Sequence, residues 1–145
     1  MKVVIVSGFF NPLHGGHLDM IEAAALMGEK LIVIVNNDVQ QVIKKDKVIL
    51  SEQNRSRLIG ALRAVDEVVV AVDNDQTVVR TLSMVASQHP DDQLIFANGG
   101  DRTSEKEVPE TEVCREYNIE MVFGVGGVEK ADSSTRINQA LGHKK

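Results

Sequence analysis

Short apolar runs and longer amphipathic segments alternate along the chain. Five runs of four or five apolar residues are bounded by polar or glycine-containing turns: Val3 to Val6, Leu31 to Val35, Val68 to Val72, Leu94 to Ala97 and Met121 to Val125. Such runs are typical of strands that are buried on both faces of a parallel sheet. We therefore predict five parallel strands.

Between these runs, apolar residues recur with helical spacing. They fall on one face of each segment: Leu18, Ile21, Ala25 and Leu26, then Leu58, Ala61, Leu62 and Val65, then Val78, Leu82 and Val85. A strand followed by a helix, repeated, predicts an α/β fold with right-handed crossovers. With 145 residues, no linker and no internal repeat, the chain is expected to form one doubly wound, Rossmann-like domain over residues 1–145.

Polar residues mark the expected element boundaries. Ser51 and Asp75 are predicted to cap the second and third helices, because their side chains can accept from unpaired helix N–H groups. Pro109 suits the first turn of a short helix that runs to Tyr117. Two polar, irregular stretches are expected to be loops, where functional groups often lie: Lys44 to Ile49 and Gly99 to Val108.

Composition narrows the classes of function. The net charge of -5 argues against a nucleic-acid partner, since phosphate-backbone affinity requires clustered Lys and Arg. Cys114 is the only cysteine, which excludes an intrachain disulfide and fits a reducing compartment. No apolar run reaches the length of a membrane span, and the first residues lack the pattern of a signal peptide. We expect a cytoplasmic protein without membrane contact.

The turn after the first predicted strand carries the chemistry. Ligands of open α/β sheets bind beyond the carboxyl ends of the strands, where backbone N–H groups and a helix N-terminus favour an anion. Gly8 would let a phosphate approach the backbone, and Gly15 and Gly16 remove bulk between His14 and His17. Both imidazoles can then face one phosphate, as phosphoryl or nucleotidyl transfer requires.

Zinc is the other chemistry that two neighbouring histidines can serve. A zinc site needs three or four clustered ligands, and the remaining histidines, His89 and His143, are far away in sequence. We therefore expect no protein-bound metal.

The segment His14-Gly15-Gly16-His17 resembles the His-x-Gly-His signature of the cytidylyltransferase-like superfamily. Three further blocks are similar to that family and follow in the same order: Leu31 to Asp38, Ser51 to Val68 and Ser133 to Ile137. The resemblance covers nearly the whole chain. It looks closest to the bacterial glycerol-3-phosphate cytidylyltransferases, with the heptose-phosphate adenylyltransferases next.

This resemblance implies an enzyme that transfers CMP from CTP to a small phosphorylated acceptor such as glycerol-3-phosphate and releases pyrophosphate. Mg²⁺ would accompany the triphosphate, and a homodimer is expected. Catalytic roles are implied for His14, His17 and Lys44. Nucleotide contacts are implied for Gly8, Phe9, Phe10, His14, His17, Asn98, Gly99, Asp101, Ser133, Ser134 and Thr135. Acceptor contacts are expected for Asn11, Asp38, Lys44, Arg55 and Arg102.

Several departures from the family pattern keep alternatives open. Phe9 stands where relatives commonly carry Thr, and Asn11 where they carry Asp. The arginine before the closing motif is absent, so Lys130 or Arg102 would have to replace it. The alternatives are an adenylyltransferase that uses ATP on a sugar phosphate or phosphopantetheine, and a nucleotide-binding module without catalysis. A dehydrogenase is disfavoured, because the first turn lacks the Gly-x-Gly-x-x-Gly pattern.

Overall fold

The computed structural model describes residues 1–45, 48–99 and 108–126. In these ranges strands and helices largely alternate: β1 (Lys2–Gly8), α1 (Gly15–Ala25), β2 (Lys30–Val35), α2 (Asp38–Lys45), α3 (Glu52–Gly60), β3 (Glu67–Val70), α4 (Val79–Gln88), β4 (Gln93–Gly99), α5 (Thr111–Glu116) and β5 (Glu120–Val125). None of the helices among the described residues combines the length and the apolar character that a membrane span needs.

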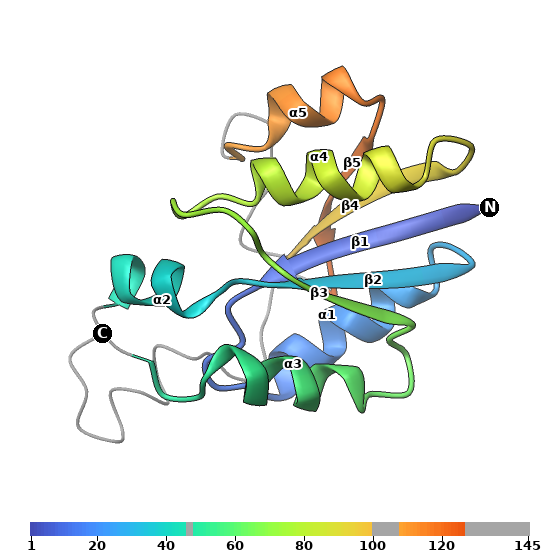
Figure 1. Ribbon diagram of the computed structural model, residues 1–145. Helices are drawn as coiled ribbons and strands as arrows, with labels where there is room; N and C mark the ends of the chain where they lie inside the picture. The colour runs from blue at the N-terminus through green and yellow to red at the C-terminus, as the bar shows by residue number, and fades with distance from the viewer. Residues whose placement is uncertain (46–47, 100–107, 127–145) are drawn as a thin grey trace.

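The strands form one sheet in the order β3-β2-β1-β4-β5 (Figure 1). Every neighbouring pair is parallel, with Val4 opposite Leu31 in β2 and Ile5 opposite Phe96 in β4. The chain builds outward from β1 to β3 on one side and then from β4 to β5 on the other. The predicted doubly wound, five-stranded parallel sheet is confirmed, and its order reverses between β1 and β4.

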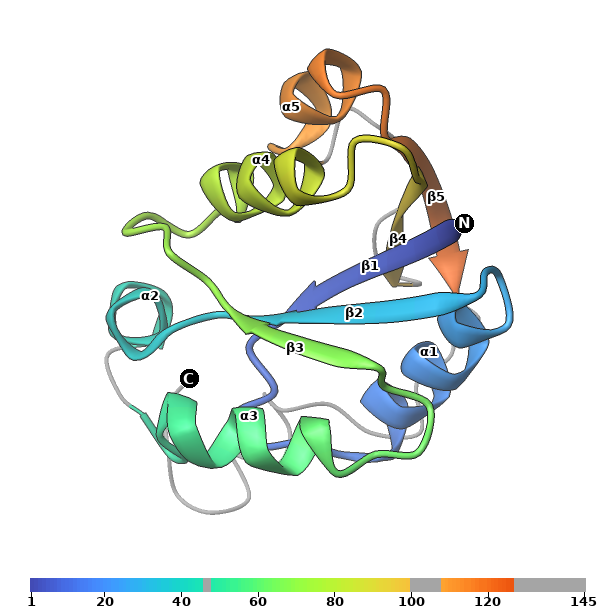
Figure 2. The same cartoon turned by 45° about the vertical axis from the view of Figure 1, so that its right-hand side comes forward.

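Helices cover both faces of the sheet. Helices α1 and α3 lie on one face, and α4 and α5 lie on the other (Figures 1 and 2). On the α1 and α3 face, Val4 and Val6 of β1 belong to a buried cluster with Ile21 of α1 and Ile59 of α3. Because side chains of a strand alternate between faces, the intervening β1 residues enter the opposite layer.

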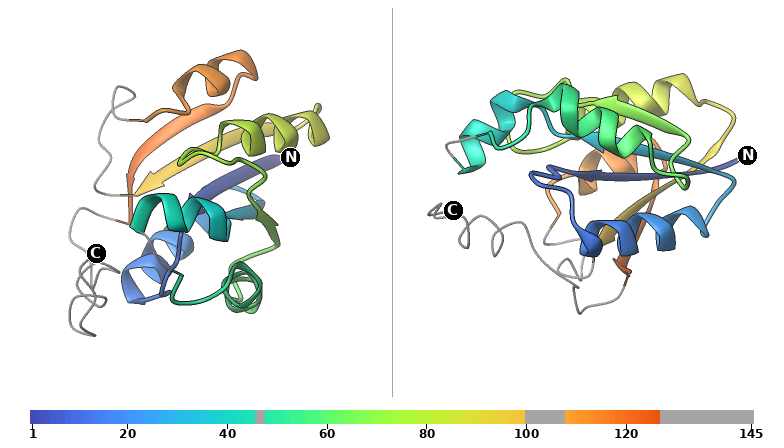
Figure 3. Two further views of the ribbon diagram at one scale, coloured as in Figure 1. Left: turned by 60° about the vertical axis from the view of Figure 1, so that its left-hand side comes forward. Right: turned by 90° about the horizontal axis from the view of Figure 1, so that it is seen from below.

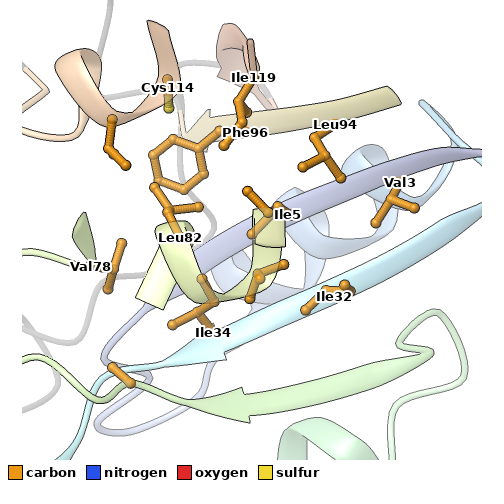
Figure 4. Packing of buried hydrophobic residues seen from close by; sticks show 14 of the residues in the cluster. Val3, Ile5, Ile32, Ile34, Val78, Leu82, Leu94, Phe96, Cys114 and Ile119 are labelled. Carbon is orange, nitrogen blue, oxygen red and sulfur yellow. The ribbon is translucent and has the colours of Figure 1, made fainter. Parts of the chain in front are cut away.

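That second layer contains Ile5 and Phe96 from the sheet together with Leu82 of α4 and Cys114 of α5 (Figure 4). All four are at most 1% exposed. Cys114 is therefore a packing residue of the core, as small apolar side chains are. Because both faces of the sheet bury apolar residues, the strands appear in the sequence as continuous apolar runs.

Helix α2 was not predicted. The sequence interpretation placed Lys44 in a loop, whereas Lys44 lies in the last turn of this helix, which follows the carboxyl end of β2 (Figure 3). Its apolar residues Val39, Val42 and Ile43 are 47–60% exposed, while Gln40 and Gln41 are at most 1% exposed. Val39, Val42 and Ile43 have helical spacing, which the sequence interpretation did not use, but in α2 the apolar face is exposed and the polar face is buried.

The prediction for the start of α4 was wrong. Asp75 accepts hydrogen bonds from the backbone N–H and the hydroxyl of Thr77, at 2.9 and 2.7 Å, within the preceding loop. The carboxylate of Asp73 accepts instead from the first-turn N–H groups of Arg80 and Thr81, at 2.7 and 3.0 Å. Asp73 is only 2% exposed. The loop between β3 and α4 therefore folds back and places Asp73, not Asp75, at the N-terminus of α4.

The other boundaries agree with the sequence more closely. The Ser51 hydroxyl accepts from the backbone N–H of Asn54, at 3.2 Å, and caps α3 as predicted. Pro109 lies just before α5, which begins at Thr111. The short helix therefore exists, but it starts two residues later than the proline suggested.

Candidate functional site

The histidine pair forms the N-terminus of α1. His14 is the N-cap residue, with extended backbone angles φ -146° and ψ 177°. Its Nδ1 accepts from the backbone N–H of Gly16 at 3.0 Å, and the Nδ1 of His17 accepts from the backbone N–H of His14 at 3.3 Å. The two rings stack with their centroids 3.8 Å apart and their planes inclined by 25°. Each imidazole thus satisfies an N–H group near the start of the helix.

This capping determines which ring nitrogen carries the proton. A nitrogen that accepts from an N–H uses its lone pair, so a neutral imidazole must then carry its hydrogen on the other nitrogen. His14 and His17 therefore both present an Nε2–H group. Two Nε2–H donors on stacked, half-buried rings at a helix N-terminus are suited to the oxygens of one phosphate group.

Phe10 supports this pair from within the protein. Its side chain is 2% exposed, and its ring meets the His17 ring edge to face at a centroid distance of 4.9 Å. A Cβ atom at Gly8 would lie 2.7 Å from the Phe10 ring. The sequence interpretation reserved the space at Gly8 for a phosphate and gave Phe10 a nucleotide contact. The Phe10 ring fills the space beside the Cα atom of Gly8 and packs against His17. The nucleotide contacts expected for Gly8 and Phe10 stay predictions.

Lys44 reaches the same turn from α2. Its Nζ atom lies 4.2 Å from the centroid of the Phe9 ring, which follows β1 directly. The fold thus brings Lys44 to the segment that carries the two histidines. The catalytic role implied for Lys44 stays a prediction. The lysine comes from a helix and not from the expected loop.

Arg55 of α3 is buried beneath the site. Its guanidinium donates to the backbone carbonyls of Leu50 (2.8 Å), Phe9 (2.7 Å) and Asn36 (2.7 Å), and to the carboxylate of Asp38 (2.7 Å). Its side chain has no exposed surface. The expected phosphate contact is therefore not provided by this arrangement. The arginine instead ties together the turn after β1, the end of β2 and the entry to α3.

Two further residues that were expected to contact the acceptor substrate, Asn11 and Asp38, lie near this arginine. The side-chain oxygen of Asn11 accepts from the backbone N–H groups of Ile49 and Leu50, at 3.1 and 2.8 Å. Asn11 is 3% exposed, so its oxygen holds the segment that leads into α3. Asp38 keeps 34% of its side chain exposed while it pairs with Arg55. Of these two residues, Asp38 is the one that a ligand can reach.

A buried amide network was missed by the sequence interpretation. The Gln40 side-chain nitrogen donates to the carbonyls of Asp75 and Thr77, both at 2.7 Å. Its oxygen accepts from the Asn36 side chain and from the Asn37 backbone. These bonds attach α2 to the β3–α4 connection, and thereby fix the helix that carries Lys44. In the sequence, the cluster of Asn and Gln residues after β2 was the signal that could have indicated this network.

The carboxyl end of β4 lies beside β1, where the strand order reverses. Asn98 is 3% exposed, and its side-chain nitrogen donates to the carbonyls of Phe96 and Val122, at 3.3 and 3.2 Å. It bridges β4 and β5 where their register shifts before Gly99. The remaining predicted residues lie outside the described part of the chain: Asp101, Arg102, Lys130, Ser133, Ser134 and Thr135.

The described residues therefore bring two imidazoles, a helix N-terminus and one ammonium group to the edge of the sheet where α/β proteins bind ligands. All of these groups attract anions. Within residues 1–45, 48–99 and 108–126 there is no group of three His, Cys, Asp or Glu side chains that could hold a metal ion.

Comparison with known proteins decides the family. Residues 5–142 match the family described as cytidylyltransferase-like. The chain belongs to this family. The resemblance inferred from the histidine signature is thus confirmed, and it places the chain among the nucleotidyltransferases.

Individual relatives extend the comparison. The bifunctional protein HldE of Gluconobacter oxydans is 37% identical over 97% of this chain, which spans only 27% of that relative. The FAD synthase of Ferroglobus placidus is 37% identical over 52% of this chain and 49% of its own length. A solved lipopolysaccharide core biosynthesis protein from Thermoplasma volcanium has a TM-score of 0.67 and 25% identity, with 91% of this chain and 99% of that chain covered.

Proposed function

We propose that this cytidylyltransferase-like protein transfers the nucleotidyl group of a nucleoside triphosphate to a small phosphorylated acceptor and releases pyrophosphate. The observation that carries the proposal is the capped histidine pair at one helix N-terminus, in which both Nδ1 atoms accept backbone hydrogen bonds and the protons therefore lie on Nε2. In the reaction, an oxygen of the acceptor phosphate bonds to the α-phosphorus. The bond from that phosphorus to the β-phosphate oxygen breaks, and pyrophosphate leaves with the electron pair.

The described residues serve this reaction by positioning and charge stabilisation. Phosphoryl and nucleotidyl transfers need little covalent help from protein groups. His14 and His17 donate hydrogen bonds to α-phosphate oxygens as negative charge develops, and the first turn of α1 adds backbone N–H groups. Lys44 supplies a positive charge for a phosphate. Mg²⁺ would arrive with the triphosphate and neutralise its oxygens, and it is usually held through few protein ligands.

For the nucleotide we favour ATP over the CTP expected from sequence. One of the relatives is named a FAD synthase, and FAD contains an AMP unit joined to a phosphorylated flavin. For the acceptor we favour a sugar phosphate. The structure from Thermoplasma volcanium is described as a lipopolysaccharide core biosynthesis protein, and such a core is built from sugars. CTP with glycerol-3-phosphate is the second candidate; the description of the matching family, cytidylyltransferase-like, supports CTP.

A panel of nucleotides and acceptors tests this proposal. ATP and CTP are each combined with sugar phosphates, glycerol-3-phosphate, FMN and phosphopantetheine, and pyrophosphate release is measured. Release from ATP with a sugar phosphate supports the proposal, and release only from CTP with glycerol-3-phosphate selects the second candidate. Triphosphate binding without turnover for any pair would identify a non-catalytic nucleotide-binding module.

The variant His14→Asn separates catalysis from folding. Asparagine is a good N-cap residue, so its side-chain oxygen can still accept from the helix N–H groups, while the Nε2–H donor is lost. Removal of one donor that stabilises developing charge lowers kcat by about 100-fold or more. The matched control is His89→Asn, since His89 lies at the far end of α4. Equal activity of the two variants would contradict the role assigned to His14.

Assembly as a homodimer stays a prediction from the resemblance. Light scattering on the purified chain measures its mass in solution, and a monomer at enzymatically active concentrations would contradict it.

A further inference from the structure

Phe9 and Lys44 form a contact between two segments of the site. The Lys44 ammonium lies 4.2 Å from the Phe9 ring centroid, which is within the range of about 6 Å for attraction between a cation and an aromatic face. Lys44 is exposed in the last turn of α2. An exposed lysine has many rotamers, so this contact selects among them.

The Phe9 ring is itself attached to a well-held stretch of backbone. The Phe9 carbonyl accepts from the buried Arg55 guanidinium at 2.7 Å. The next residue is Phe10, whose buried ring meets His17. The position of the Phe9 ring is therefore coupled through a few bonds to the position of the histidines. A lysine that rests on this ring is placed relative to those histidines.

An aromatic ring holds a cation in a way that suits phosphate binding. The ring attracts the ammonium through its quadrupole. It carries no net charge of its own, so the ring adds no negative charge that would repel an incoming anion.

We propose that Phe9 is a positioning residue that holds the Lys44 ammonium beside the histidine pair before a phosphorylated ligand binds. This inference rests on the proposed function, because it assigns Lys44 to a phosphate of the nucleotide or acceptor. It concerns the contact that this chain's own Phe9 makes with Lys44.

A double-mutant cycle tests the proposal. Phe9→Leu keeps an apolar side chain without the aromatic face, and Phe9→Tyr keeps the ring. A contact between a cation and an aromatic ring at an exposed site strengthens binding by about two- to fivefold. We expect Phe9→Leu to raise the KM for either the nucleotide or the phosphorylated acceptor by about that factor, with kcat nearly unchanged. Phe9→Tyr should keep the wild-type KM. In a Lys44→Gln background the Phe9→Leu change should have no further effect.

Controls separate this contact from general loss of packing. Phe123→Leu removes a ring from β5, packed against the α4 and α5 layer, and should leave KM unchanged. Either of two results would overturn the proposal. In the first, Phe9→Leu still raises KM in the Lys44→Gln background. In the second, Phe9→Tyr raises KM as much as Phe9→Leu does.

A readout without turnover distinguishes failure of this proposal from failure of the proposed function. Protons of the Lys44 side chain near the Phe9 ring should show upfield ring-current shifts in NMR spectra of the unliganded protein. These shifts should disappear in Phe9→Leu and persist in Phe9→Tyr, whether or not any substrate pair turns over. Absence of the shifts in the wild-type chain would overturn the contact itself. Absence of turnover with the shifts present would defeat only the transferase proposal.

Discussion

Replacement of Arg55 by methionine is the most direct test of the buried framework under the site. Methionine fills a similar elongated space but cannot donate, so three backbone carbonyls and the Asp38 carboxylate lose their partner. The Asp38 side chain is 34% exposed and can be rehydrated. The carbonyl of Asn36, a residue that is 3% exposed, has less access to water and remains unpaired.

The size of the effect follows from these environments. An unsatisfied buried polar group costs about 1–3 kcal/mol, and removal of one partner from a buried ion pair costs about 3–5 kcal/mol. Since only part of the Arg55 surroundings is fully enclosed, we expect a loss of about 3–5 kcal/mol in the free energy of unfolding. For a domain of this size each kcal/mol lowers Tm by about 2–4 °C, so Tm should fall by about 6–20 °C.

Urea unfolding of Arg55→Met against Arg57→Met measures this difference. Arg57 lies on the same helix and is exposed, so its replacement should change the free energy of unfolding by less than about 1 kcal/mol. A loss below about 1 kcal/mol in Arg55→Met would refute the reasoning. If the KM for the acceptor also rose strongly, the phosphate contact expected from sequence would be restored.

Three further predictions concern other parts of the framework. Gly8→Ala should lower both Tm and turnover, because the added Cβ would lie 2.7 Å from the Phe10 ring that supports His17; an unchanged Tm would contradict this packing. Asp73→Ala should cost about 0.5–2 kcal/mol in urea unfolding through loss of the α4 cap, whereas Asp75→Ala should cost less. The pKa of Asp75 lies below its ordinary value of 3.8, chiefly because the Thr77 hydroxyl and then the Thr77 backbone N–H donate to it. The stabilisation from this lowered pKa is complete at pH values above the ordinary pKa, and it is lost as the pH falls through the lowered pKa of the folded protein. An NMR titration should show that the Asp75 pKa is higher in Thr77→Val than in the wild-type chain.

Local sequence determined the architecture and the identity of the central motif. The five strands are encoded by short apolar runs, because helices cover both faces of the sheet: β1, β2 and β4 are mostly buried, and the edge strands β3 and β5 are partly buried. The histidine pair is equally local: its cap bonds join residues two or three positions apart. Features that depend on neighbours in sequence can be derived from sequence.

Tertiary structure alone decided which polar residues are enclosed. Arg55 and Arg57 are two positions apart on one helix, yet one is buried and the other exposed, because the acceptors of Arg55 include carbonyls 19 and 46 positions away. In α2 the polar side is the buried one, because the Gln40 side chain makes amide hydrogen bonds to residues 35 and 37 positions away. Apolar burial is non-directional and leaves a periodic pattern in the chain. A buried polar group is stable only where the folded chain supplies its particular partner, and no local pattern records where that partner will be.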